Sequence, residues 1–186
     1  MYPYLYKITA QVTPLKYDCG LLCSSICCRP DPNDTLGIYL YPGEEKMFSG
    51  QEDWLVWEEH NRDEQFFPPS WPNTIYFIQC IKSCPRESRP LACRFFPLAP
   101  HITPQNELLL IHETLALPYD CALINNRIPL QQKFIETVAH CWDILLSDYR
   151  LLDLIEEDSR DRDVHNEKLE VIWQKNHKKS VLNQFP

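Results

Sequence analysis

The stretch DCGLLCSSICC, residues 18 to 28, decides how the rest of this sequence is interpreted. It places four cysteines within ten positions, and the last two of them are adjacent. With the later cysteines of the first two thirds of the chain, the set is Cys19, Cys23, Cys27, Cys28, Cys80, Cys84, Cys93 and Cys121. Thiolates bind zinc and iron strongly and often hold them in groups of four. The set therefore predicts metal binding, as two four-thiolate sites or as one cluster with cysteines left over.

The adjacent cysteines Cys27 and Cys28 affect the number of metal ions that the chain is expected to bind. Cys19, Cys23 and Cys27 would share a face on a helix, and in a tight loop they could converge on one ion. The side chains of adjacent residues diverge, particularly in extended chain. Cys27 and Cys28 are therefore expected to face different metals or to bridge two of them, which favours a two-site or polynuclear arrangement.

The thiols are expected to be reduced. The opening residues, MYPYLYKITAQVTPL, lack a basic region followed by an apolar one, so we predict no secretory leader. No apolar run approaches the roughly 18 residues that span a bilayer, and no membrane association is expected. The predicted location is the cytoplasm, where disulfides are rare, and an odd count of nine cysteines also disfavours a disulfide framework.

The net charge of the chain limits the classes of partner that it is expected to bind. The formal net charge is −8 and the pI is near 5.2. Nucleic-acid binding usually needs a basic patch, so no nucleic-acid partner is expected. The one basic cluster, Lys175 to Lys179, is interpreted as a solvated helix end or tail. A metal ion is the first expected partner, and a protein partner is the second.

Composition predicts a small, loop-rich α+β fold around the cysteines. Sixteen prolines and four glycines are present, and most of the prolines lie between Pro30 and Pro129 among many aromatic residues. Proline fixes φ and removes a donor, so long helices and central strands are not expected there. Short strands are expected near residues 4–13, 36–41, 75–79 and 107–112.

The last third of the chain is expected to be helical. Its apolar residues recur at three- and four-residue steps, which predicts an amphipathic helix over about 129–157 that lays its stripe on the rest of the protein. The charged run EEDSRDRD, 156–163, should break the pattern, and a shorter helix should follow over about 166–176. The stripe consists of Phe134, Val138, Cys141, Trp142, Leu145 and Tyr149. The predicted parts are a cysteine-rich metal-binding domain, 1–128, and C-terminal helices, 129–186, packed on it as one structural unit.

The other candidate metal ligands in the sequence are less convincing than the eight cysteines. Cys141 lies on the apolar stripe and is interpreted as a core residue rather than a ligand. No two histidines have metal-site spacing: His112 closes a predicted strand, and His101 and His140 are interpreted as structural. Glu44 and Glu45 follow Pro-Gly and most simply begin a helix, although a carboxylate could also bind iron or accept from an arginine.

No catalytic motif is present. The chain has no phosphate-binding glycine loop and no G-x-S-x-G, and its second cysteine gap is one residue too long for radical S-adenosylmethionine chemistry. Catalytic residues are not identified, and an enzyme is the less favoured class.

The element RPLACRFFP, 89–97, has a physical interpretation of its own. A four-thiolate zinc site carries excess negative charge. Arg89 and Arg94 flank Cys93 and are expected to donate hydrogen bonds to sulfur and offset that charge. Phe95 and Phe96 would shield the metal from water. An ordinary arginine pair on a packed surface loop is the alternative.

These patterns resemble a known family. The spacing C-x3-C-x3-C-C, the segment LYPGEE at 40–45, the element RPLACRFFPL at 89–98 and the late Cys121 are similar to the CxxxCxxCC family of zinc- or iron-chelating proteins. The flagellin lysine N-methylases share a related pattern. The resemblance covers about residues 18–125. It departs from the family in a gap of three rather than two residues before the adjacent pair, and in a long insertion between Cys28 and Cys80.

The resemblance implies chelation of zinc or iron, including the case of an iron–sulfur cluster, and no settled reaction. We therefore expect a cytoplasmic metal-binding protein that holds its metal by thiolates. The alternatives are an iron–sulfur redox or metal-transfer protein and, less favoured, a protein-modifying enzyme related to the N-methylases.

Overall fold

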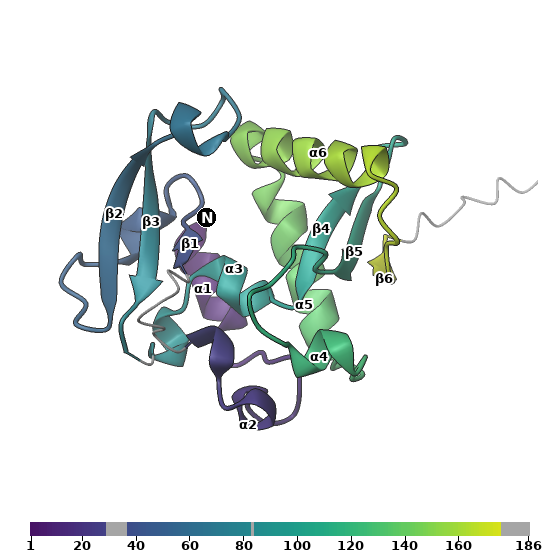
Figure 1. Cartoon of the computed structure of the whole chain (residues 1–186), viewed down its shortest axis with the longest axis horizontal. Helices are drawn as coiled ribbons and strands as arrows, with labels where there is room; N and C mark the ends of the chain where they lie inside the picture. The colour runs from purple at the N-terminus through teal and green to yellow at the C-terminus, as the bar shows by residue number, and fades with distance from the viewer. Residues whose placement is uncertain (29–36, 83, 176–186) are drawn as a thin grey trace, which may run out of the picture.

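The computed structural model describes residues 1–28, 37–82 and 84–175, and it has an α+β fold rich in loops (Figure 1). The α-helices are α1 Tyr2–Thr9, α2 Gly20–Cys23, α3 Leu91–Phe95, α4 Ala122–Asn125, α5 Gln132–Leu145 and α6 Tyr149–Val164. The 3-10 helices are η1 Ile26–Cys28, η2 Glu44–Met47, η3 Asp63–Gln65 and η4 Arg86–Ser88. The strands are β1 Gly37–Tyr39, β2 Leu55–Asn61, β3 Thr74–Cys80, β4 Leu98–Ile102, β5 Leu108–His112 and β6 Val171–Gln174.

The strands form two small antiparallel sheets, with the orders β1-β3-β2 and β4-β5-β6. In Figure 1 the sheets lie on opposite sides of the molecule, with α1 and α3 between them and α6 across one end. No helix in the described ranges is long and apolar enough to cross a membrane. The sheets and helices bring the cysteine-bearing loops to the same side, where α2 and α4 are drawn.

The main core lies where α1, α3, α5, α6 and β5 meet. Its fully buried side chains include Leu5, Phe95, Leu110, Phe134 and Trp142. Burying a side chain of this size contributes about 1.5–3 kcal/mol to the free energy of folding. The core takes residues from both sides of residue 128, because α1 packs on α5 and α6 packs on β4.

The predicted apolar stripe of the C-terminal third is confirmed for five of its six residues. Phe134, Val138, Cys141, Trp142 and Leu145 are all buried in the main core. Tyr149 is instead 65% exposed. The reason is that the helix does not continue to that residue with unbroken geometry.

The single long helix expected over 129–157 is two helices. The chain leaves α5 at Leu145 and begins α6 at Tyr149, where the Asp148 side chain caps α6 by accepting a hydrogen bond from the Arg150 N–H at 3.1 Å. Asp is a preferred N-cap because it satisfies an N–H that has no partner within the helix. The charged run 156–163, expected to break the pattern, lies inside α6.

Two other element predictions are wrong. Residues 4–13 were expected as a strand, but Tyr2–Thr9 form α1, in which Tyr2, Leu5, Tyr6 and Thr9 share the buried face. Apolar and polar residues alternate in this segment, but its buried residues are also three or four positions apart, as in a helix. The short helix expected over 166–176 is the edge strand β6, which pairs Trp173 with Leu110 of β5. Residue 176 lies outside the described residues.

The proline-rich middle contains more sheet than expected. Strands near 75–79 and 107–112 are confirmed as β3 and β5, and the strand near 36–41 corresponds to β1, with residue 36 outside the described residues. β2 and β4 were not predicted, and both β3 and β5 are central strands of their sheets, contrary to expectation. Pro100 fits within β4 because this strand lies at a sheet edge, where a missing donor is tolerated.

Candidate functional site

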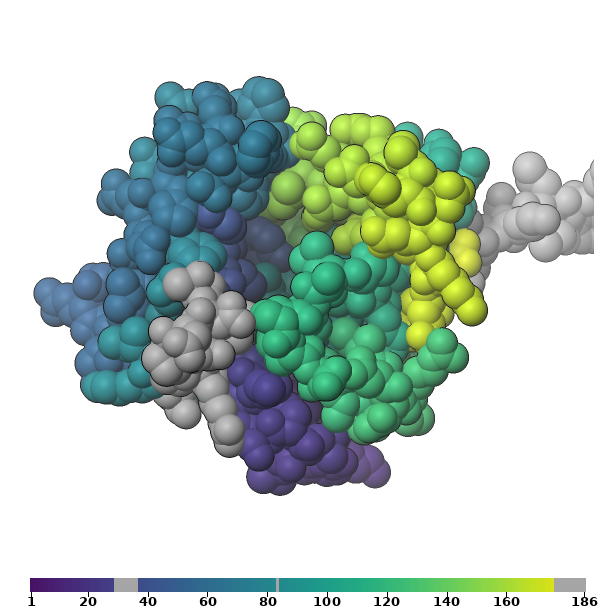
Figure 2. Space-filling view, in the orientation of Figure 1, coloured from purple at the N-terminus to yellow at the C-terminus, as the bar shows by residue number. Residues whose placement is uncertain are grey.

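Three distant segments bring their cysteines to one region of the molecule. The first is the loop of α2 and η1, the second runs from the end of β3 to α3, and the third precedes α4. Figure 2 shows the purple surface of the first segment beside the green surface around α4. All nine cysteines are free thiols, and the set varies from the buried Cys84 and Cys121 to the exposed Cys27 and Cys93.

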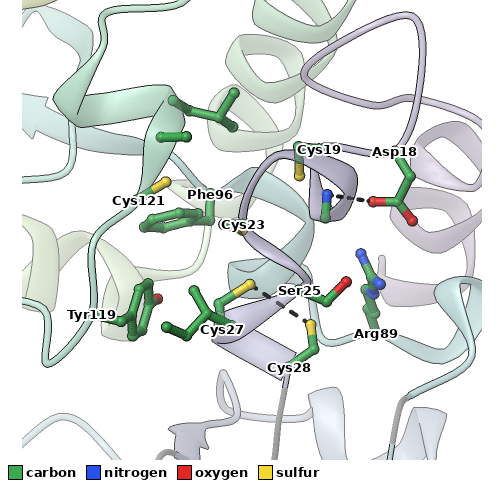
Figure 3. A pocket seen from close by; sticks show the side chains of 14 residues that line it. Asp18, Cys19, Cys23, Ser25, Cys27, Cys28, Arg89, Phe96, Tyr119 and Cys121 are labelled. Carbon is green, nitrogen blue, oxygen red and sulfur yellow. Dashed lines mark hydrogen bonds between the residues drawn. The ribbon is translucent and has the colours of Figure 1, made fainter.

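A pocket collects five of the thiols. Its lining includes Cys19, Cys23, Cys27, Cys28 and Cys121. The centre of a water-sized sphere can occupy about 30 Å³ of it, which is room for an ion or one to two water molecules. Figure 3 shows Cys121 and Tyr119 on one side of this pocket and Arg89 on the other. Asp18 and Phe96 complete the polar and aromatic parts of the lining.

A tight turn of the first segment presents its thiols to this pocket. Helix α2 ends at Cys23, and Ser24 and Ser25 then have φ values of 55° and 57°. The Ser25 N–H donates to the Gly20 carbonyl at 2.9 Å. A Cβ on Gly20 would lie 2.2 Å from the Ser25 Oγ, so any larger residue here would require the Ser25 hydroxyl to move. The cysteines thus occupy a tight loop, one of the two arrangements that the spacing allowed, and not one continuous helix.

A chain of thiol contacts leads away from the pocket. The Cys27 and Cys28 Sγ atoms lie 3.8 Å apart, shown as a dashed line in Figure 3. Cys84 packs in one apolar cluster with Cys28 and Cys80, and Arg89 lines the adjoining pocket. Four cysteines from η1, β3 and the segment after β3 therefore lie in one neighbourhood, which we call the thiol chain, and the Cys27 and Cys28 sulfurs are in contact. The expectation that the adjacent side chains of Cys27 and Cys28 diverge is wrong, because η1 is a tight helical turn and not extended chain.

The spacing of the adjacent pair fits a shared metal. Two thiolates on one tetrahedral zinc, with Zn–S bonds of about 2.3 Å, lie about 3.8 Å apart. The Cys27–Cys28 sulfur distance is also 3.8 Å. Across residues 1–28, 37–82 and 84–175, however, no group of three or more His, Cys, Asp or Glu side chains is arranged as a metal site. One sulfur pair thus has a spacing compatible with a shared metal, and the described residues do not form a complete ligand set.

The direction of the pKa shift alternates along the thiol chain, with two thiols lowered and two raised. Hydrogen bonds from Cys28 and Cys80, together with Arg89, lower the pKa of Cys84. A hydrogen bond from Cys28 lowers the pKa of Cys27 to about 7, and Arg89 assists. Donation of these hydrogen bonds raises the pKa of Cys28 and of Cys80. Two of the four thiols therefore have lowered pKa values, a shift toward the thiolate, which is the form that binds metal.

Two small apolar clusters flank the thiols. One lies on the β1-β3-β2 sheet, where the buried Trp54, Leu55 and Ile78 pack with Cys84 and Cys28. The other lies around α4, where Leu15 and Leu123 pack with Cys121 and Cys19. Both are separate from the main core. Burial in the second cluster's surroundings raises the pKa of Cys19 to about 11. The thiols thus form two neighbouring groups, each on its own apolar support.

The two arginines expected to face sulfur are placed differently. Arg89 lines the pocket beside the thiols, as expected, and is among the groups that lower the pKa of Cys84. Arg94 donates to the Arg89 carbonyl at 2.7 Å, the Tyr6 carbonyl at 3.0 Å and the Thr9 Oγ1 at 2.9 Å. Its guanidinium also stacks 4.1 Å from the centre of the Tyr6 ring. In the described chain these contacts tie α3 to α1 and direct Arg94 away from the thiols.

Glu44 is a buried carboxylate whose environment the sequence did not indicate. It is 1% exposed and begins η2, so the helix-start interpretation holds. It accepts hydrogen bonds from the Tyr6 hydroxyl at 2.8 Å, the Leu91 N–H at 2.7 Å and the Tyr41 N–H at 3.1 Å. Burial raises the pKa of Glu44. The carboxylate therefore joins α1, η2 and α3 beneath the cysteine region.

The remaining expectations concern aromatic residues and histidines. Phe96 lines the pocket, whereas Phe95 is buried in the main core. Tyr119 also lines the pocket and was missed, although its position two residues before Cys121 was a usable signal. No histidine within the described ranges lines this pocket: His112 ends β5 as predicted and His101 lies in β4.

Comparison of the chain with family models, with curated proteins and with solved structures found no match. The interpretation of the site accordingly rests on its residues and their geometry.

Proposed function

We propose that this chain is a cytoplasmic zinc- or iron-binding protein that holds its metal with cysteine thiolates. The observation that carries the proposal is the convergence of three distant segments on one group of thiols, with the Cys27 and Cys28 sulfurs at the 3.8 Å spacing of two ligands on one tetrahedral ion. The similarity of the cysteine pattern to the CxxxCxxCC family supports the same function.

The contacts suggest how the ligands would be grouped. The Cys27 and Cys28 sulfurs are in contact, and Cys28, Cys80 and Cys84 share one apolar cluster, so these four cysteines would form one four-thiolate site. The remaining pocket thiols, Cys19, Cys23 and Cys121, would form the second, with the exposed Cys93 as fourth ligand. Arg89, beside Cys84, would offset the excess negative charge of the first site.

A bound ion would act first as a structural cross-link. Zinc or iron supplies strong bonds to thiolate, and binding energy at a structural site is also folding energy. Each thiol group would tie its small apolar cluster to the loop of α2 and η1. Protein partners would then bind a surface whose shape depends on the metal.

Metal transfer or redox chemistry is the second candidate, and one observation favours it. Cys27 and Cys93 are exposed, so an ion held by either of them would be within reach of solvent and of another protein's thiols. Closed structural sites usually shield all of their ligands. An iron–sulfur cluster would be the redox form of the same candidate.

The deciding experiment is elemental analysis with an ultraviolet–visible spectrum on protein purified without oxygen. Zinc in a colourless protein supports a structural site, and iron with sulfide and absorption in the visible range supports the redox candidate. Cys28→Ser and Cys23→Ser should lose metal, whereas Cys141→Ser, whose sulfur lies in the main core, should keep all of it. Metal content in Cys28→Ser equal to that of the wild type would refute the assignment.

A further inference from the structure

The thiol chain has a gradient of exposure that metal binding does not require. Cys27 is exposed, Cys28 is partly buried and Cys84 is buried. The Cys27 and Cys28 sulfurs lie 3.8 Å apart, and Cys28 in turn packs against the apolar cluster that contains Cys84. A soluble oxidant would therefore meet Cys27 first, and two further sulfurs stand in line behind it.

We propose that Cys27, Cys28 and Cys84 form a hydroperoxide-reactive thiol relay whose end product is a Cys28–Cys84 disulfide. The oxidant class is a hydroperoxide. The relay acts on the same thiols as the proposed metal site, and its effect on metal rests on that proposed function.

The first step oxidises Cys27. Its thiolate attacks the terminal oxygen of the peroxide, the O–O bond breaks, and the leaving oxygen takes a proton to give water or an alcohol. Cys27 is then a sulfenic acid. The Cys28 sulfur attacks the Cys27 sulfur, an S–S bond forms, and the displaced hydroxide takes up the Cys28 proton as water.

The second step passes the oxidation inward. Adjacent Cα atoms are only 3.8 Å apart, which is shorter than the usual 4.4–6.8 Å across a disulfide, so the bond between Cys27 and Cys28 is readily exchanged. The Cys84 thiolate attacks the Cys28 sulfur, and Cys27 leaves as a thiolate that accepts the proton given up by Cys84. The sum is two thiols and one hydroperoxide giving one disulfide, water and a second water or alcohol.

The product would join two separate segments. Cys28 ends η1, and Cys84 follows β3 on the apolar cluster of the β1-β3-β2 sheet. Arg89, which lines the pocket together with Cys28, stands beside the final bond. Two of the four proposed ligands of the first metal site would be lost, so oxidation would release that ion.

The test uses reduced, chelator-treated full-length protein exposed to hydrogen peroxide, then alkylated, digested and analysed by mass spectrometry. A peptide cross-linked between Cys28 and Cys84 is expected in the wild type and in Cys93→Ser, a matched control that removes the other exposed thiol. The cross-link should be lost in Cys28→Ser and should form more slowly in Cys27→Ser. Over-oxidised Cys27 without the cross-link, or an unchanged rate in Cys27→Ser, would overturn the relay.

A second measurement tests the order of oxidation in the wild type alone, so it does not depend on whether the variants fold. In the wild type, pulse alkylation during oxidation should show that the Cys27 thiol is lost early and then recovered, while the thiols of Cys28 and Cys84 are lost for good. A Cys27 thiol that stays constant throughout contradicts the proposed order.

The effect on metal is measured separately, with zinc-loaded protein and a chromogenic chelator. Zinc should be released at the rate at which the cross-link forms. Protein that takes up no zinc before oxidation refutes the proposed function and leaves the relay to the first test. Zinc that stays bound while the cross-link accumulates refutes the coupling of the relay to the metal.

Discussion

At the scale of single residues, Glu44 offers a sharp test of the fold. Replacing it with alanine removes one buried acceptor from three donors, the Tyr6 hydroxyl and the Tyr41 and Leu91 N–H groups. Unsatisfied buried donors are costly, and we expect Glu44→Ala to lower the free energy of unfolding by about 3 kcal/mol. Urea denaturation measures the change. Glu45→Ala, which removes only an acceptor of the Gly43 N–H, should cost under about 1 kcal/mol. Equal losses would contradict the described role of Glu44.

Two buried histidines contribute to the pH dependence of stability with a known sign. Burial lowers the pKa of His101 and of His112, so each binds its proton less tightly in the folded state. Asp163 faces His101 and Glu170 faces His112, and they oppose these shifts, whereas Arg162 and Arg127 add to them. In the unfolded chain histidine binds a proton near pH 6.5, so the unfolded state holds more protons below that pH.

The contribution of these two histidines to stability is therefore expected to fall as the pH drops below about 6.5, by up to about 1.4 kcal/mol per histidine for each unit of pKa shift. Denaturation in urea at a series of pH values measures it as the difference between the wild type and the variants His101→Gln and His112→Gln. A difference that stays constant between pH 7 and 5 would contradict this expectation.

At the scale of elements, the periodicity of apolar residues predicted the correct secondary structure for some segments and the wrong one for others. The stripe of α5 was found because five buried residues repeat at helical spacing. Residues 2–9 were misassigned because a short helix with Tyr and Thr on its buried face also looks alternating. β6 was misassigned because Ile172 and Trp173 acquire their partner only through pairing with β5, a tertiary contact that local spacing does not encode.

The same limit applies to the candidate site. Residue type and spacing were enough to select the cysteines and Arg89. They could not show that η1 brings Cys27 and Cys28 together, that Arg94 binds α1 instead of sulfur, or that Glu44 is buried. Each of these facts depends on a turn or a neighbour from a distant segment.

The β1-β3-β2 sheet is the element that should depend most on metal. Its apolar cluster contains Cys84 and is separate from the main core, so a metal site on these thiols would stabilise it directly. Chelation should raise amide hydrogen exchange in Thr74–Cys80 by about tenfold or more, with little change in Leu108–His112 of β5. Exchange by mass spectrometry or NMR distinguishes the strands. An equal rise in both would contradict separate stabilisation.

At the scale of the whole molecule, residues 1–128 should not fold alone. The main core loses Phe134, Val138, Trp142 and Leu145 in that fragment. At about 1.5–3 kcal/mol each, their sum is comparable to the 5–15 kcal/mol that stabilises a typical domain. Circular dichroism and NMR dispersion should show an unfolded fragment with or without zinc, whereas a chain ending at Lys175 retains every residue of the core. A fragment 1–128 with native-like dispersion would refute this expectation.

The packing of α1 on α5 has a consequence for the newborn chain. The core cannot close until residues up to Ile155 have left the ribosome, whereas Cys121 and the cysteines before it emerge earlier. At about 5–20 residues per second, this leaves an interval of several seconds. During that interval the thiols would be open to the cell's zinc, iron and peroxide before any scaffold exists to arrange them. The rate of translation would thus affect whether the cysteines first react with a metal ion or with a peroxide.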